Sequence, residues 1–550
     1  MSSPSVLVVG GGPTGLVLAL ALAKNSVPVR VIEKFPGPIV GQRGAGLQPR
    51  TLEIHNFLGT YNDIAQRGQP IFKFRMYPIG AGDQGFMERE FVPHIEPSDS
   101  TPLPNPWRMG QDTQTEILRS HLAKHGVFVE TGTELRKFEQ KPDHVEVEIV
   151  KLDGGKETIE IAQFPYIVGA DGASSIIRKG LDVTFLGETR DTELMLVGDV
   201  HIEEGAPAPG FFHLYGDAST SMLGIRDTEH ENRYSFNLAG AELAIDDLLN
   251  NRDELLQVMT RISGRTDIKW GEVTWLSKYR PNIRMADRFG SGRCFIAGDA
   301  AHVHSPSGGQ GMNSGCMDAF NLAWKLALVV KGLAKPSLLV SYTDERLPVI
   351  ATMLKMTTKL HRTVITQGNT ESGWRRDGSL TQLGVNSRGS PIVVDERTRA
   401  QDVVFNPYDT NLNAPRVAGD RAPDSTELHD LKGASDVTRL FQIYGPAHHT
   451  VLVFAGTAND AKTLLDATLK AAKSAPLRSV VVLPLEAESV GETTSAANYV
   501  LVDQKGLARR NYQVEASAPP TAVVVRPDGV LGAIATRTQG VETYFGNILL

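Results

Sequence analysis

The sequence predicts an α/β protein of several domains: a parallel-sheet domain, an antiparallel sheet inserted into it, and a smaller α/β domain at the C-terminus. Three observations support this fold class. The apolar strand Ser5–Gly10 runs into a glycine-rich turn and a helix, which is typical of a parallel sheet. Residues 183–280 instead hold strands with alternating polarity, and strands and helices alternate again from Thr438. At 550 residues the chain is also too long for one hydrophobic core.

We expect the first domain to be discontinuous, because a strand, turn and helix pattern returns after the inserted sheet. Its two parts are residues 1–182 and 281–370, on either side of a sheet domain at 183–280. Residues 371–425 are rich in Gly, Pro, Asn and Asp and are predicted to be a linker. Residues 426–550 form the last domain.

The composition argues against several classes of protein. A net charge of -7 gives no basic excess, so nucleic acid is not expected as a partner. The longest apolar run is interrupted by Lys325 and Lys331, which leaves nothing near the roughly 18 residues needed to span a bilayer. Cys294 and Cys316 have no metal-type spacing and are expected to be buried thiols. We therefore expect a cytoplasmic protein without a metal site or a membrane span.

The first strand leads into the turn Gly10-Gly11-Gly12-Pro13-Thr14-Gly15, and a helical run follows. Gly10, Gly12 and Gly15 match GxGxxG in the context that this motif requires, with a strand before it and a helix after it. The next strand ends at Glu33, where a carboxylate can accept both hydroxyls of an adenosine ribose. The N-terminal part is therefore predicted to be a Rossmann-like dinucleotide-binding domain.

The stretch Arg293–Asn313 predicts the other end of the same ligand. A short apolar strand leads to Gly298 and Asp299, then to a loop with several glycines, and an amphipathic helix begins after the loop. Glycines allow a close approach of the backbone, and a helix N-terminus offers free N–H groups to an electron-rich group. Something flat and partly anionic is expected here.

Between these motifs lies a further strand and turn, Tyr166–Arg178. Ser174 or Ser175 can cap the helix that follows. Asp171 and Arg178 are expected to form an ion pair that fixes the turn, which is a structural role.

The inserted domain is predicted from four alternating strands and one helix, which suits an antiparallel sheet with one free face. The expected elements are Leu194–Ile202, Gly210–Tyr215, Ser221–Ile225, Arg233–Leu238 and a helix over Leu243–Ile262.

Three separated segments resemble the class A flavoprotein monooxygenases, whose members include 4-hydroxybenzoate hydroxylase and phenol 2-monooxygenase. They are GGGPTG with Glu33, DGASSIIR, and GDAAHVHSPSGGQGMNSGCMDAFNLAWKL. The resemblance covers residues 1–365. The C-terminal part, opened by AGDRAPD, is similar to the thioredoxin-like domain of the phenol hydroxylase branch. It holds no cysteine, so we expect it to serve stability or homodimer contacts instead of dithiol chemistry.

The resemblance implies a bound FAD. The N-terminal glycines would lie under its pyrophosphate, Glu33 would hold the adenosine ribose, and Asp299 would accept a ribityl hydroxyl. Pro306 to Asn313 would border the isoalloxazine. The cofactor-binding residues expected in this way are Gly10, Gly12, Pro13, Thr14, Gly15, Glu33, Lys34, Arg43, Gln111, Asp299, Pro306, Gly309, Gly311, Met312 and Asn313.

Two of these assignments rest on further reasoning. Arg43 suits the phosphate side of the cofactor, because a guanidinium matches paired phosphate oxygens. The family places a glutamine near the ribityl chain, but the spacing to Glu116 is one residue longer here than the family pattern. Gln111 and Gln114 therefore both remain candidates.

The activity that the resemblance implies is hydroxylation of a phenol. NADPH or NADH would bind transiently and reduce FAD, O₂ would give a flavin C4a-hydroperoxide, and its distal oxygen would pass to the ring. Loss of a ring carboxylate from a hydroxybenzoate is one variant of this reaction. The alternatives are another FAD-dependent oxidoreductase, such as a halogenase or a reductase, and a non-catalytic flavin-binding protein.

The residue that activates the phenol is the open point of the sequence. Where the phenol hydroxylase branch has an aspartate, this chain has Ala45. His213, Tyr215 and Arg226 are the catalytic candidates, because a sheet over the flavin turns some of its residues toward it. Phe211, Phe212 and Phe236 could line a substrate pocket or belong to the core. His302 and His304 are expected to orient the flavin loop.

Overall fold

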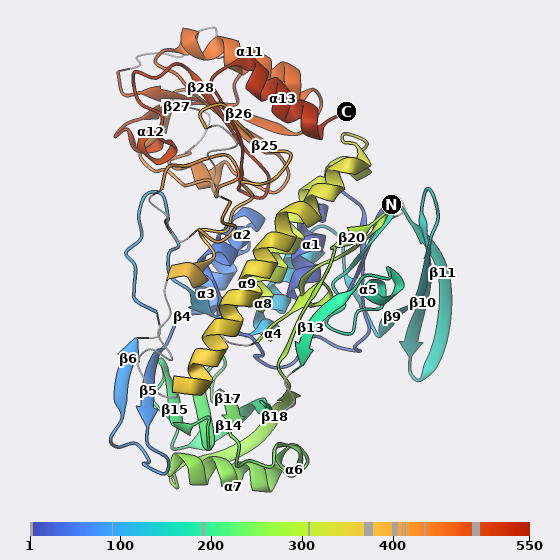
Figure 1. Cartoon of the computed structure of the whole chain (residues 1–550), viewed down its shortest axis with the longest axis vertical. Coiled ribbons are helices and arrows are strands. Elements are labelled where there is room, and N and C mark those ends of the chain that lie inside the picture. The colour runs from blue at the N-terminus through green and yellow to red at the C-terminus, as the bar shows by residue number, and fades with distance from the viewer. Residues whose placement is uncertain are drawn as a thin grey trace.

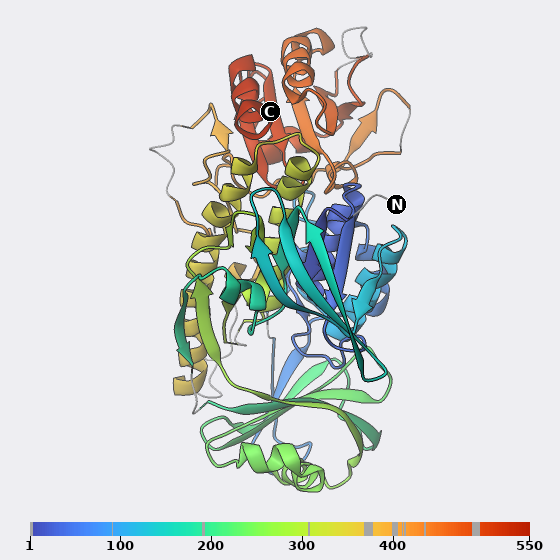
Figure 2. The ribbon, with the colours of Figure 1, turned by 90° about the vertical axis from the view of Figure 1, so that its right-hand side faces the viewer.

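A computed structural model describes residues 4–90, 92–189, 193–305, 308–367, 378–398, 405–409, 411, 414–433, 436–486 and 495–550. The protein is built in three layers along its longest axis (Figure 1). The C-terminal domain lies at the top of the view, the parallel-sheet domain in the middle and a large, mainly antiparallel sheet at the bottom. The side view shows the same stacking (Figure 2).

The middle layer is organised around a six-stranded sheet whose central strand is the N-terminal β1. All four residues of β1 are buried, and it pairs in parallel with β2 on one side and β12 on the other. Such a strand is apolar on both faces because helices cover the sheet from both sides. In spatial order the strands are β20 (Gly290–Ser291), β21 (Cys294–Ile296), β12 (Tyr166–Gly169), β1 (Val6–Val9), β2 (Val29–Glu33) and β8 (Val129–Thr131).

Two helices of this layer begin at the glycine motifs of the sequence. Helix α1 starts with a proline in its first turn directly after Gly12, and α8 starts at Gly311. Helix α2 ends where Gly59 adopts a left-handed conformation with φ of 73°. The helices of the layer are α1 (Pro13–Lys24), α2 (Pro49–Leu58), α3 (Tyr61–Arg67), α4 (Gln111–Ala123), α5 (Ile176–Gly180), α8 (Gly311–Val330) and α9 (Val340–Gln367).

Three small sheets flank the middle layer. One of these sheets contains a hairpin of β10 and β11, with its turn at Gly154 and Gly155, and a third strand, β9. The small sheets are β11 (Lys156–Phe164), β10 (Val145–Asp153) and β9 (Thr133–Gln140); β13 (Phe185–Thr189), β19 (Asn282–Ala286) and β22 (His302–Val303); and β3 (Gly46–Leu47), β7 (Trp107–Arg108) and β4 (Gln69–Pro70).

The bottom sheet has seven strands and draws them from two parts of the chain. Strands β5 and β6 come from the segment before the insertion, and β5 pairs in parallel with β15. The sheet predicted within residues 183–280 therefore extends beyond that range. In spatial order it comprises β18 (Lys269–Tyr279), β14 (Met195–Glu204), β17 (Arg233–Ala239), β16 (Ser221–Asp227), β15 (Phe211–Asp217), β5 (Lys73–Tyr77) and β6 (Met87–Glu90).

The helix predicted over Leu243–Ile262 is two helices, α6 (Ile245–Asn250) and α7 (Arg252–Ser263). They divide at Asn251, whose side chain accepts the backbone N–H of Glu254 and so caps α7. The two helices cover the face of the sheet that is turned away from the middle layer (Figure 2).

The C-terminal domain is a mixed sheet with helices, consistent with the expected thioredoxin-like arrangement. Strand β25 is parallel to β26 and antiparallel to β28, and β28 is antiparallel to β29. The strands are β23 (Val394–Asp395), β29 (Leu531–Ala535), β28 (Thr521–Val525), β25 (His449–Phe454), β26 (Leu477–Pro484), β27 (Tyr499–Asp503) and β24 (Leu428–Asp430), with α11 (Ala458–Ala472), α12 (Leu507–Tyr512) and α13 (Thr538–Ile548).

A cluster of fully buried charges joins the C-terminal domain to the middle layer. Glu345 on α9 accepts hydrogen bonds from Lys325 on α8 at 2.9 Å and from Arg526, after β28, at 2.8 Å. All three side chains have no exposed surface. Arg526 also pairs with Asp528, which accepts a hydrogen bond from Asn321 of α8. Burial lowers the pKa of Lys325 to about 8, although the charge of Glu345 opposes this.

The segment predicted to be a linker adds a second buried ion pair. Arg421 donates to both carboxylate oxygens of Glu53 on α2, and Arg50 donates to the same carboxylate. Strand β23 of this segment pairs with β29. The described parts of the linker are therefore packed between the two domains.

Among the described residues, none of the helices combines the length and the apolar composition that a membrane crossing needs.

We expect Glu345→Gln to lower the free energy of unfolding by about 3–5 kcal/mol, because it leaves two buried cations without this carboxylate. Urea unfolding followed by tryptophan fluorescence measures the change. Glu130→Gln is the matched control, since Glu130 is 37% exposed in its pair with Arg30 and should cost about 1 kcal/mol or less. Equal losses for the two variants would contradict a special role for Glu345.

Candidate cofactor and substrate cavity

A large cavity lies between the middle layer and the seven-stranded sheet. Its volume is about 1630 Å³, larger than the roughly 300–1,000 Å³ of a site for one small ligand. Both glycine motifs line it, and so does one face of the seven-stranded sheet. The cavity therefore has room for a cofactor and a second molecule.

At one end of the cavity the N-terminal turn has the shape that a diphosphate needs. Gly10 has a φ of 112°, and a Cβ there would lie 2.1 Å from the carbonyl oxygen of Ala170. A Cβ on Gly15 would lie 2.0 Å from the Gly10 oxygen, so this glycine lets α1 pack against the turn. At Gly12 a Cβ would meet only Ile39 at 4.0 Å, which leaves the helix N-terminus open to the cavity.

Acidic and basic groups follow this turn along the cavity wall. Glu33, at the end of β2, accepts the N–H groups of Gly11 at 2.8 Å and Phe35 at 3.0 Å, and its side chain also lines the cavity. Lys34 lines the same wall. Arg43 has a left-handed backbone with φ of 48°, and its guanidinium lies 5.9 Å from the ring centroid of Trp275. Burial lowers the pKa of Arg43, although Glu33 opposes the shift.

The structure brings one of the two candidate glutamines to the cavity. Gln111, in the first turn of α4, lines the wall and donates a hydrogen bond to the carbonyl of Gly44 at 3.3 Å. Gln114 is fully buried and hydrogen-bonded to His55 at 3.0 Å. The extra residue in the spacing therefore turns Gln114 into the core.

At the far end the cavity meets the N-terminus of α8. Asp299 is open to the cavity but deep within the protein, and burial raises its pKa. Gly309, Gly311 and Met312 also line this end. Asn313 fixes the loop by accepting the N–H of Gln48 and donating to the carbonyls of Gly46 and Gly309.

The side chain of Gln310 does not cap the first turn of α8, and Gly311 and Met312 of this turn line the cavity. Pro306, also expected at this end, lies outside the described residues.

The comparisons with known proteins agree on one family. A family model described as an FAD binding domain matches residues 3–357, which is more than half of the chain. A flavin-dependent monooxygenase of Mycobacteroides abscessus is 33% identical over 99% of this chain and 100% of its own length.

The chain belongs to the FAD-binding, flavin-dependent monooxygenase family.

Further similarities extend over both chains. Pentachlorophenol 4-monooxygenase of Sphingobium chlorophenolicum is 28% identical over 98% of this chain and 94% of its own. Among solved structures, the flavin-dependent monooxygenase PieE with FAD and substrate has a TM-score of 0.78 at 20% identity, covering 99% of this chain and 98% of the other. Aklavinone-11 hydroxylase with FAD and aklavinone has a TM-score of 0.76 at 24% identity, covering 99% of both chains. These two similarities support the fold.

The residues present fit FAD. The open Gly12 cradle and the α1 N-terminus suit its pyrophosphate, and the acidic end of β2 suits its ribose. The uncapped N-terminus of α8 suits the ring system, which becomes anionic on reduction. Asp299, which is open to the cavity, would accept a hydroxyl of the ribityl chain.

The rest of the cavity is an apolar compartment formed by the seven-stranded sheet. Phe72, Phe74 and Phe212 line it and pack against one another with ring centroids 5.2 to 5.8 Å apart. Phe236 belongs instead to the core on the other face of the sheet, and Phe211 packs under Arg75. Ala45 lines the cavity, so no carboxylate stands at that position.

Strand alternation separates the three residues proposed as catalytic. Phe212 and Leu214 face the cavity. Because side chains alternate along a strand, His213 and Tyr215 point to the opposite face, which packs against α7. His213 is hydrogen-bonded to the Tyr77 hydroxyl at 3.0 Å and to the carbonyl of Ala208 at 2.8 Å. Neither His213 nor Tyr215 lines the cavity, so the structure does not support a catalytic role for them.

Arg226 is the member of that set that faces the cavity. It lies opposite Phe212 in the register of β15 and β16, and residues paired in this way share a face. Among the described residues, no carboxylate lies within 4.0 Å of its guanidinium as an ion-pair partner. Arg226 donates instead to Gln42 at 3.2 Å and to the carbonyl of Asp227 at 3.1 Å.

Sequence reasoning missed Gln42, which joins the sheet to the cofactor wall. Its N–H donates to the buried carboxylate of Asp199 at 2.8 Å, and its side chain donates to Glu229 at 3.0 Å. Its carbonyl accepts the N–H of Gln111. The sequence signal for this contact was Asp199 within the otherwise apolar run Leu196–Val200, since a buried carboxylate needs partners.

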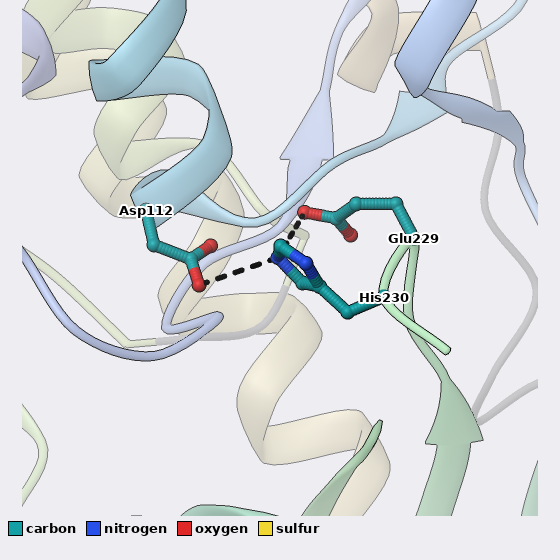
Figure 3. Close-up of side chains that lie close together, drawn as sticks. All are labelled: Asp112, Glu229 and His230. Carbon is teal, nitrogen blue, oxygen red and sulfur yellow. Dashed lines mark ion pairs between the residues drawn. The ribbon is translucent and has the colours of Figure 1, made fainter. Parts of the chain in front are cut away.

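A polar cluster at the edge of this network could be taken for a metal site. Figure 3 shows His230 between the carboxylates of Asp112 and Glu229, and its Nε2 lies 3.6 Å from each. Asp112 is already paired with Arg233, and Glu229 accepts the Thr113 hydroxyl. Protein donors therefore serve both carboxylates, which favours a structural network, and the absence of a metal site stays a prediction.

The other residues singled out in the sequence have structural contacts. Ser175 caps α5 by accepting the N–H of Arg178, as expected. The ion pair between Asp171 and Arg178 was a wrong prediction, because Arg178 donates to the carbonyls of Ala300 and Ala173 instead. His302 binds the buried Asp318 at 2.6 Å.

We expect Asp299→Ala to weaken FAD binding about tenfold or more, because a hydrogen bond to a charged group is lost. Titration of the apoprotein with FAD, followed by flavin fluorescence, gives the dissociation constant. Asp253→Ala on the exposed side of α7 is the matched control and should leave FAD affinity unchanged. Unchanged affinity in Asp299→Ala would remove Asp299 from the cofactor contacts.

The structural position of His213 predicts a pH effect on stability. Burial lowers its pKa to about 4, so between pH 6.5 and 4 the unfolded chain takes up a proton that the folded protein does not. The stability that depends on a neutral His213 is fully present above pH 6.5 and is lost as the pH falls toward 4. Between pH 7.5 and 5.5 the loss is about 1 kcal/mol, which His213→Gln should abolish. Urea unfolding at both pH values measures it, and equal pH dependence in the two proteins would contradict the assignment.

Proposed function

We propose that the protein hydroxylates a phenolic aromatic compound with O₂ and NADPH or NADH, and that Arg226 binds the phenol oxygen. The observation that carries this proposal is the apolar, phenylalanine-lined compartment that opens onto the flavin end of the FAD cavity. The residues of β14 to β17 that line the cavity are all described, and Arg226 is the one charged residue among them.

The bound FAD supplies the chemistry of oxygen activation and is reduced by the nicotinamide. The chain provides the environment. The uncapped N–H groups of α8 stabilise negative charge at their end of the cavity. The phenylalanine wall holds an aromatic ring and excludes water from it.

Arg226 can favour ionisation of the phenol, a role for which position 45 offers only an alanine side chain. A phenol has an ordinary pKa near 10, and an adjacent positive charge lowers such a pKa by about 1–3 units. The phenolate is more electron-rich at the ring carbons than the phenol, which suits an electrophilic oxygen. Ser235, which lies opposite Arg226 in the register of β16 and β17 and lines the cavity, can donate a hydrogen bond to the same oxygen.

The names of the relatives support this substrate class. They include a pentachlorophenol 4-monooxygenase and, at 36% identity over 64% of this chain, a 6-methylpretetramide 4-monooxygenase of Streptomyces rimosus. The solved relative that is a hydroxylase of aklavinone supports it as well. A panel of phenols with one ring and with several fused rings is therefore the appropriate first screen.

The test is substrate-stimulated oxidation of NADPH and NADH by the FAD-loaded protein, with product identified by mass spectrometry. A phenol should accelerate the oxidation and gain one oxygen atom. Hydrogen peroxide as the sole product with every phenol, or protein that does not take up FAD, would overturn the proposal.

We expect Arg226→Met to lower kcat/KM for the phenol about 10- to 100-fold, because a hydrogen bond to a charged oxygen is lost. The acidic limb of the pH profile should move to higher pH by about 1 unit or more, since the phenol returns toward its ordinary pKa. Arg226→Lys keeps the charge and should shift the limb less.

Arg75→Met is the matched control. Arg75 lies on β5 of the same sheet but packs on Phe211 and Phe86, away from the cavity. It should leave the pH profile unchanged. An unchanged profile in Arg226→Met would remove Arg226 from the contacts of the reacting oxygen.

A further inference from the structure

A second cavity lies where the middle layer meets the C-terminal domain. Its volume is about 600 Å³, which is within the range of sites for small organic ligands. Among the described residues, its lining shares no member with that of the FAD cavity. Lys24 on its wall ends α1, so the cavity is about 17 Å along that helix from the FAD pyrophosphate cradle. Figure 1 shows this junction between α1, α2 and the C-terminal domain.

The ionisable side chains of this cavity, apart from its two tyrosines, are all basic. Lys24 and His125 come from the middle layer, and Arg439, His448 and Arg478 come from the C-terminal domain. No aspartate or glutamate is among the described lining residues, in a protein whose net charge is -7. A cleft lined by one sign of charge concentrates its field and attracts ions of the other sign.

Two of these cations lack a carboxylate partner. Arg439 is paired with Asp424, but Arg478 donates to the neutral carbonyl of Ile443 at 2.9 Å. Within the described part of the chain, neither Lys24 nor Arg478 forms an ion pair with a carboxylate. Burial lowers the pKa of Lys24, and the positive charge of Lys124 lowers it further. Burial also lowers the pKa of His448 to about 4, so its ring is neutral at neutral pH.

Four aromatic side chains contribute to the remaining wall, and they come from both domains. Phe57 and Tyr61 lie on the side of the middle layer, and Phe441 and Tyr444 lie on the other. The rings of Phe57 and Phe441 are 5.1 Å apart, which joins the two halves of the wall. A ligand that fills this space therefore needs an apolar body as well as negative charge.

We propose that this interdomain cavity binds a small phosphate monoester with a ring-bearing body. A phosphate monoester carries about −1.5 to −2 charges at pH 7 and can neutralise two cations at once. Its oxygens suit the guanidinium of Arg478 and the ammonium of Lys24, one from each domain. The site is separate from the FAD cavity and goes beyond the proposed hydroxylation. Because it contacts both domains, its ligand should also raise the melting temperature of the protein.

The test is isothermal titration of the FAD-loaded, full-length protein with three probes. Phenyl phosphate carries both the ring and the charge, inorganic phosphate carries the charge alone, and benzyl alcohol carries the ring alone. The variants are Lys24→Met and Arg478→Met. Lys137→Met, an exposed lysine on β9, is the matched control. FAD content and circular dichroism establish that each variant is folded.

We expect phenyl phosphate to bind at one site per protein. Its affinity should fall about tenfold or more in Lys24→Met and in Arg478→Met, and should stay unchanged in Lys137→Met. Inorganic phosphate binding as tightly, with the same dependence on Lys24, would support the charge recognition and make free phosphate the ligand. Phenyl phosphate with equal affinity for wild type and both variants, or no saturable binding, would overturn the proposal. Substrate-stimulated NADPH oxidation should be unchanged in both variants, so failure of this site and failure of the proposed hydroxylation are told apart.

Discussion

The carboxylate of Glu345 is the contact on which the arrangement of the domains depends. It neutralises Lys325 of α8 and Arg526 of the C-terminal domain in a region without exposed surface. Helix α8 begins at the flavin end of the FAD cavity and reaches this carboxylate three to four turns later. A buried charge of this kind is weak evidence for net stability, since apolar residues of equal volume could replace the whole group. Its effect is to fix the rotation of α8, because Lys325 on this helix is paired with this carboxylate.

The two ends of the FAD cavity could be predicted from the sequence because each is local. Gly10 to Glu33 and Asp299 to Asn313 are short stretches whose backbone geometry follows from their own residues. The substrate compartment could not be predicted in the same way, because it depends on strand register. Arg226 and Phe212 share a face only through the pairing of β15 and β16, and a register shifted by one residue would have exposed His213 to the cavity instead. The contribution of β5 to that sheet had no local signal at all.

The polar contacts around the cavity explain how the two layers keep a fixed distance. Gln42 binds Asp199 and Glu229 of the sheet and, through its carbonyl, the first turn of α4. The neighbouring residue is Arg43, whose left-handed backbone places it on the cofactor wall. A change on the sheet at Arg226 is therefore connected to the cofactor wall through one fully buried amide. A one-residue connection of this kind leaves little freedom for the two layers to slide.

The discontinuity of the parallel sheet has a consequence for how the protein is made. The N-terminal strand β1 lies at the centre of the sheet, but β21, on the far side of β12, is synthesised nearly three hundred residues later. Pairings between such distant segments form slowly, and the outer edge of β12 has no partner until β21 has been synthesised. Gly10 and Asp299, which both line the FAD cavity, come together only after that point. FAD can therefore be captured by both ends only after most of the chain has left the ribosome, and its incorporation is a late event that reports on correct assembly.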